Sequence, residues 1–159
     1  MKTLYIILLY ILSLVLETTV FGKLSVFGAK PDLVLIVIVL VALHRGPLPG
    51  EIYGFIGGLL EDFVTFGSLG IQALVKTLTG FGVGFLRNKI EEENGFLLML
   101  LVFFMALISG FAASLAKTFF SSYVFLSKDA LRIVLAALYT MLLTPPVMIL
   151  VKKIFAERK

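Results

Sequence analysis

Long apolar runs, separated by short polar or Gly/Pro segments, extend through this sequence from end to end. Of its 159 residues, 60% are hydrophobic and only 15% are charged, and the mean hydropathy is +1.08. A soluble domain of this size does not need so much apolar surface. The sequence therefore predicts an all-α integral membrane protein, with a single transmembrane helical domain over residues 1–159.

The lengths of the apolar runs predict a bundle of six transmembrane helices. A helix that crosses about 30 Å of hydrocarbon needs about 20 residues. The second run is short for a full crossing, which predicts local thinning of the bilayer or cover by a partner. The loops are too short to form a domain outside the membrane. The expected spans are residues 3–21, 31–44, 49–66, 69–86, 96–121 and 130–151.

The distribution of lysine and arginine sets the orientation. Eight of these residues lie on the side that holds both termini and five on the opposite side, which places the N- and C-termini in the cytoplasm. The first span is interpreted as an uncleaved signal anchor, because no small-residue cleavage site follows it. The net charge of +4 comes from residues at the ends of spans, near lipid headgroups, so no nucleic-acid partner is expected.

Few residues could support catalysis or bind a cofactor. The chain has no cysteine, and its one histidine, His44, lies in a short Gly/Pro loop. Intramembrane enzymes need a nucleophile with a base, paired aspartates on different helices, or a metal site. The aspartates are Asp32, Asp62 and Asp129, and the first and last lie near span ends. We expect no enzymatic activity, no metal and no cofactor.

Glycines mark one face of the third expected span. Residues 50–62 read GEIYGFIGGLLED, and at about 100° per residue the glycines fall on one side of the helix. Small residues let helix backbones approach closely in lipid. This favours tight packing within the bundle, with a homodimer face or a ligand cleft as alternatives. The expected packing glycines of the third and fourth spans are Gly50, Gly54, Gly57, Gly58, Gly70, Gly80 and Gly84.

Ionisable residues on three spans are expected at a similar depth. At 1.5 Å per residue, Glu17, Asp62 and Lys76 each lie about 10 Å below the outer edge of the hydrocarbon core. An unpaired charge at this depth costs at least about 2–3 kcal/mol. We therefore expect Lys76 to pair with Glu61 or Asp62, with Glu17 close by. This intramembrane polar cluster would be an ion-pair clamp, or else a proton or ion relay or a polar pocket that opens outward.

Several short patterns follow one another in a familiar order. A Lys-Pro-Asp sequence at 30–32 opens an apolar run, the glycine stretch at 50–62 ends in an acid, and Leu-Gly at 69–70 opens the next run. This ordered set, over residues 30–86, resembles the rod shape-determining protein MreD family. Glu61 departs from the family pattern, in which the acid corresponds to Asp62. The residues that match the family motif are Pro31, Asp32, Asp62, Leu69 and Gly70.

The resemblance implies a function in cell elongation. It implies a multi-pass protein of the bacterial inner (cytoplasmic) membrane, a non-enzymatic scaffold for rod shape and peptidoglycan synthesis. The implied partner is MreC, a single-span membrane protein, and through it MreB filaments and peptidoglycan synthases. The family is also similar in fold to the substrate-binding subunits of energy-coupling-factor transporters, so the alternative is a subunit that captures a vitamin-type small molecule. The candidate partner surfaces are the second span, which is apolar all round, and the small-residue face of the fifth span.

Overall fold

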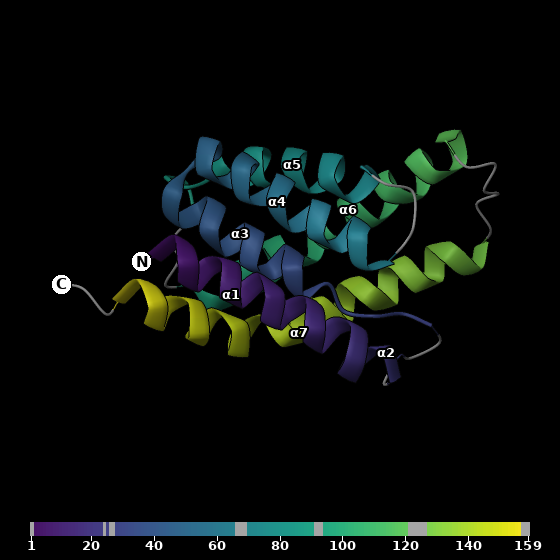
Figure 1. The fold of residues 1–159 in the computed structure, drawn as a ribbon, viewed down its shortest axis with the longest axis horizontal. Coiled ribbons are helices and arrows are strands. Elements are labelled where there is room, and N and C mark those ends of the chain that lie inside the picture. Colours follow the sequence, from purple (N-terminus) through teal and green to yellow (C-terminus); the bar gives the residue numbers. More distant parts are fainter. Residues whose placement is uncertain are drawn as a thin grey trace.

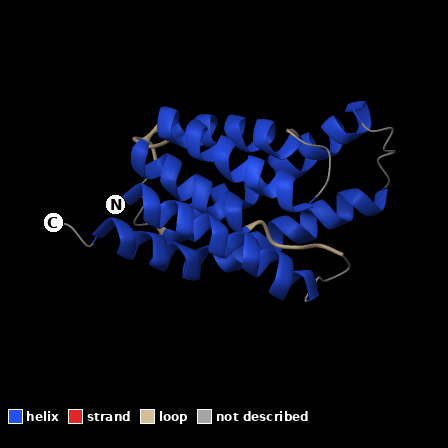
Figure 2. Ribbon diagram, viewed as in Figure 1, coloured by secondary structure: helices blue, strands red, loops and turns tan. Residues whose placement is uncertain are grey.

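The structure is a computed structural model of the chain, and it describes residues 2–23, 25, 28–65, 70–90, 94–120 and 127–156. Within these ranges the regular elements are helices joined by loops and turns (Figure 2). The predicted all-α class is confirmed for this part of the chain.

The helices form six continuous runs in the described residues. The first run changes its winding near its end, where the turn Leu16–Val20 is a π-helix. By length and composition, α6 and α7 are apolar enough to cross a membrane, and the runs Leu4–Val20 and Leu33–Arg45 are shorter apolar helices. The elements are α1 (Lys2–Val15), η1 (Leu16–Val20), α2 (Phe21–Lys23), α3 (Leu33–Arg45), α4 (Pro47–Thr65), α5 (Ile71–Gly84), α6 (Gly95–Phe120) and α7 (Ser127–Ala156).

The helices lie along the long axis of the molecule, with α3 at the centre. In Figure 1, α4 and α5 lie on one side of α3, and α1 and α7 lie on the other. The beginning of α1 and the end of α7 lie at the same end of the bundle. The site described below is built at the opposite end, where α4 ends and α5 begins.

Helix α3 is the core of the bundle. Every residue from Leu33 to Leu43 is buried, most of them completely. A helix that is apolar on all sides can be stable only when it is covered on all sides by protein or lipid. Here the cover comes from the other helices of the same chain, so the prediction that this span is a partner surface is wrong.

Helices α4 and α5 pack backbone against backbone. A Cβ atom added to Gly54 would lie 2.8 Å from the carbonyl carbon of Lys76, and one added to Gly58 would lie 2.6 Å from the Cα of Ala73. Neither position has room for any side chain, because the atoms in the way are main chain. The glycines that face the backbone across this antiparallel interface are Gly50, Gly54, Gly58, Gly80 and Gly84.

Gly57 faces a different neighbour. A Cβ at this position would lie 3.1 Å from the ring of Tyr10 on α1 and 3.1 Å from the side chain of Val34 on α3. Tyr10 is completely buried and stacks on Tyr53 of α4, with 6.4 Å between ring centroids. The glycines of α4 therefore face the interior of their own bundle on two sides, toward α5 and toward α1 and α3.

Helices α6 and α7 pack through side chains. Gly110 of α6 meets Ile133 of α7, whose methyl carbon Cγ2 would lie 2.8 Å from an added Cβ. Pro145 and Pro146 lie inside α7, which is assigned as one helix from Ser127 to Ala156. The two helices diverge from the bundle at the end where α6 stops and α7 starts (Figure 1).

Candidate functional site

Lys76 is the centre of a buried ionic cluster. Its side chain is 0% exposed, and its ammonium group donates to Oδ1 of Asp32 at 2.8 Å and to Oε2 of Glu61. Glu61 also accepts a hydrogen bond from the Gln72 side chain, at 3.0 Å to Oε1. One ammonium group therefore joins the start of α3 to the end of α4.

The pair of Lys76 with Glu61 is one of the two pairings that the depth of these residues predicted. Asp32 is a partner that the sequence reasoning missed, because it assigned this residue to a span end. A signal was available, since Asp32 precedes an uninterrupted apolar run and is a preferred residue type for a helix N-cap. An N-cap at the outer end of one span can reach a lysine in the outer part of another.

Asp32 joins three helices through its carboxylate and its backbone N–H. Its carboxylate accepts from the backbone N–H of Leu35 at 2.7 Å, which caps α3, in addition to the bond from Lys76 on α5. Its own backbone N–H donates to the Thr140 hydroxyl on α7 at 2.9 Å. Pro31, its neighbour in the family motif, is buried. This corner of the bundle is therefore held by charge-assisted bonds, which are stronger than bonds between neutral groups.

Asp62 does not pair with Lys76. Its carboxylate accepts from the backbone N–H groups of Gly70 at 2.9 Å, Ala73 at 3.1 Å and Gln72 at 3.2 Å. The first N–H groups of a helix have no partner within the helix. The Asp62 carboxylate is the acceptor for these N–H groups at the start of α5. Asp62 lies about 100° around α4 from Glu61, which explains why only Glu61 reaches the ammonium group of Lys76.

Gly70 was predicted to be a packing glycine, and this is wrong. Its φ angle is +94°, and an added Cβ would meet nothing within 4 Å. The residue is needed for its left-handed conformation, which is unfavourable for residues with a side chain. It directs its own N–H toward Asp62 as the chain enters α5. Leu69, the other residue of this motif pair, lies outside the described residues.

Glu17 approaches the cluster from the π-helical turn η1. It is partly buried and interacts electrostatically with Asp32, Glu61 and Lys76, and with the backbone N–H of Leu33. Its Oε2 atom is buried and has no hydrogen-bond partner within the part of the chain that the structure describes. The structure therefore brings Glu17, Glu61 and Lys76 together as predicted, with Asp32 in the place expected for Asp62.

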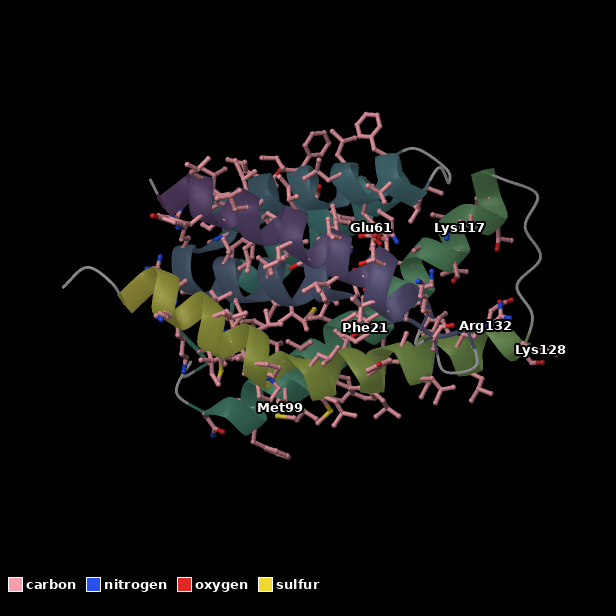
Figure 3. All side chains as sticks on the ribbon, turned by 60° about the horizontal axis from the view of Figure 1, so that its bottom comes forward. Phe21, Glu61, Met99, Lys117, Lys128 and Arg132 are labelled. Atoms are coloured by element: carbon pink, nitrogen blue, oxygen red, sulfur yellow. The ribbon has the colours of Figure 1, made fainter. Side chains whose placement is uncertain are left out.

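A cavity of about 170 Å³ adjoins the cluster. It is bounded by the loop before α3 and by residues of η1, α4, α5, α6 and α7. Small residues of α6, among them Ala106, Gly110 and Ala113, form part of its wall. Figure 3 shows nitrogen and oxygen atoms gathered near Glu61 inside the bundle, away from Lys128 and Arg132 on α7. The polar residues that line the cavity are Glu17, Lys30, Asp32, Glu61, Gln72, Ser109 and Thr140.

The sequence matches the family model of the rod shape-determining protein MreD over residues 1–154. The chain belongs to the MreD family. The match covers nearly the whole chain, whereas the motifs that indicate the resemblance lie within residues 30–86. Neither the curated proteins nor the solved structures gave a match.

Membership of the MreD family assigns the chain to rod-shape determination. The family is associated with the membrane and with the MreC and MreB shape machinery in general, and it is a structural component, not a known family of enzymes. The apolar helices α6 and α7 are compatible with a membrane protein. In this MreD-family chain, Asp32 and Asp62, both motif acids, fix the first turns of α3 and α5.

Proposed function

We propose that this chain is a non-enzymatic scaffold of the cell-elongation machinery that binds an MreC-like single-span protein within the bacterial inner membrane. Through that partner it would be linked to MreB-like filaments and peptidoglycan synthases. The observation that carries the proposal is the family match over residues 1–154. The internal geometry supports it, because the motif acids join helices of the bundle.

We also propose that the six helical runs are six spans, with both termini in the cytoplasm. An even number of crossings returns the chain to its starting side, and the start of α1 and the end of α7 share one end of the bundle (Figure 1). The outward surface supports this arrangement, since large apolar side chains are exposed along the bundle and would contact lipid. Examples are Leu12, Leu78 and Leu142.

The partner would bind an outward face of the bundle, because α3 is enclosed. The natural sequence has no cysteine, so single cysteines can be introduced without background. We expect a cysteine at Leu12, Leu78 or Leu142 to form cross-links with cysteines in an MreC-like partner at one of these faces. A cysteine at Val37, which is 0% exposed, is the matched control and should form none.

Co-purification in detergent tests the scaffold function directly. Stable recovery of a single-span elongation protein with the tagged chain is the expected result. The alternative function, a substrate-binding transporter subunit, is favoured by one observation, the cavity beside the ionic cluster. Recovery of an ATPase module together with a bound small molecule, and no elongation protein, would replace the scaffold proposal with this alternative.

A further inference from the structure

We propose that the cavity beside the ionic cluster is a binding site for a primary ammonium group, with Glu17 as its counter-ion. The inference does not depend on which partner the scaffold binds. It starts from a cavity of about 170 Å³ whose lining combines charged and polar side chains with small apolar ones. A single water needs only about 10–15 Å³ of such space, so the cavity has room for a small organic group.

Four donors beside the cavity already bond to groups of the protein. Lys76 bonds to Asp32 and Glu61, and the Gln72 side-chain amide bonds to Glu61. The hydroxyl of Thr140 donates to the Ala136 carbonyl at 2.7 Å, and the hydroxyl of Ser109 donates to the Ala106 carbonyl at 3.2 Å. Lys30, a further donor in the lining, is exposed, whereas the buried Oε2 of Glu17 has no hydrogen-bond partner in the described residues. A ligand that completes this site must therefore bring a hydrogen-bond donor.

The charges favour a cationic donor. Three carboxylates, those of Glu17, Asp32 and Glu61, line the cavity, and the buried cation Lys76 is shared by two of them. Lys30 also lines the cavity, but it is exposed. A buried carboxylate oxygen without a donor, as Oε2 of Glu17 is, is costly, and an ammonium group offers it both charge and N–H donors.

A metal ion fits the site less well. The structure shows no group of three or more metal-ligating side chains in the residues it describes. Lys76 already bonds to Asp32 and Glu61, and among the described residues Glu17 forms no salt bridge with it. A primary ammonium group needs a single carboxylate and has three donors for neighbouring oxygens, so it suits this arrangement better than a divalent cation, which takes several oxygen ligands.

The ammonium group could come from a lipid headgroup or from a free amine. The cavity lies at the end of the bundle away from the start of α1, so in the proposed orientation it is in the outer half of the membrane, about 10 Å below the outer edge of the hydrocarbon core. Native mass spectrometry of the full chain in detergent distinguishes the two sources. The probes are phosphatidylethanolamine, phosphatidylcholine, whose trimethylated nitrogen has no N–H donor, and free ethanolamine.

We expect phosphatidylethanolamine to bind more tightly than phosphatidylcholine. Glu17→Gln should weaken that preference by roughly tenfold to a hundredfold, the range for loss of one charge-assisted hydrogen bond. Glu51→Gln, which changes a carboxylate of α4 outside the cavity lining, is the matched control and should leave binding unchanged. Binding of free ethanolamine with the same dependence on Glu17 identifies a free amine as sufficient, whereas its failure to bind identifies the lipid headgroup.

A second variant separates ligand loss from misfolding. Ala136→Leu places an aliphatic side chain in the wall of the cavity and leaves Glu17 in place. We expect it to abolish the preference for phosphatidylethanolamine while the protein stays monodisperse. Equal binding of both phospholipids by the natural chain overturns the proposal, and so does a preference that neither Glu17→Gln nor Ala136→Leu reduces.

Discussion

The α4–α5 pair and the α6–α7 pair are held together by different atoms. Between α4 and α5 the contacts are main chain against main chain, at glycines whose added Cβ would collide with the opposite backbone. Between α6 and α7, Gly110 faces the side chain of Ile133. A side chain can change its rotamer and a backbone cannot, so the first interface should tolerate far less change than the second.

The two helix pairs also differ in the polar interactions between their helices. Lys76 and Glu61 form an ion pair between α5 and α4, and Asp62 caps α5 from α4. By length and composition, α6 and α7 are the described helices that qualify as membrane spans, and α4 and α5 do not. The pair that does not meet this criterion is therefore the pair with backbone-to-backbone packing and the buried ion pair. Helices of this kind depend on each other for a stable place in lipid.

Of the changes considered, removal of the ammonium group of Lys76 should lower the stability of the protein most. Lys76→Met leaves the buried Glu61 and the partly buried Asp32 without their cation, and loss of one partner of a buried pair costs about 3–5 kcal/mol. We expect loss of the monodisperse peak at a clearly lower temperature in detergent. Lys117→Met, on α6, is the matched control and should have little effect. If the two variants have the same melting temperature, the ionic cluster does not stabilise the α4–α5 pair.

A methyl group added to each interface tests the contrast in packing. Gly54→Ala places its Cβ against the Lys76 backbone and should cost about 1–3 kcal/mol, the usual range for overpacking. Gly110→Ala on α6 meets a side chain that can move, so it should cost less. Thermal stability of both purified variants, measured side by side, gives the answer. A larger loss for Gly110→Ala would contradict the stated difference between the interfaces.

Loss of the acid that caps α5 should have a smaller effect. Asp62→Ala removes the acceptor for three backbone N–H groups, and loss of a helix cap costs typically about 1 kcal/mol. The expected result is a modest fall in melting temperature with normal abundance in the membrane. Asp62→Asn keeps an acceptor oxygen and should recover part of the loss. Equal stability of the Ala variant and the natural chain would show that the cap contributes nothing.

The smallest effect is expected on the outward face of α7. Leu142 is 68% exposed within the bundle, so Leu142→Ala removes few internal contacts. Substitutions outside the core usually change stability by less than about 0.5 kcal/mol. We expect an unchanged melting temperature for the purified chain. A decrease comparable to that of Gly54→Ala would mean that this face is packed against something in the purified state, such as a second copy.

Hydropathy and helix geometry predicted much of the fold. The lengths of the apolar runs anticipated six helical runs, and the depth of Glu61 and Lys76 anticipated their contact. The enclosure of α3 was not predicted, because a helix that is apolar on all sides looks the same in lipid as in protein. The role of Gly70 was missed for a related reason, since a glycine needed for its backbone angle and one needed for close packing look identical in a sequence.

The position of α3 bears on how the chain is made. A ribosome delivers α3 before α4, α5, α6 and α7, which together with α1 surround it in the finished molecule. During synthesis this 13-residue helix is therefore made before most of the helices that cover it. Until they are made, it is exposed either to lipid or to the insertion machinery. Its apolar surface on all sides suits it to that interval, when lipid would cover the faces that α4 to α7 take over. Of these helices α7 follows the others along the chain, so it completes the enclosure of α3.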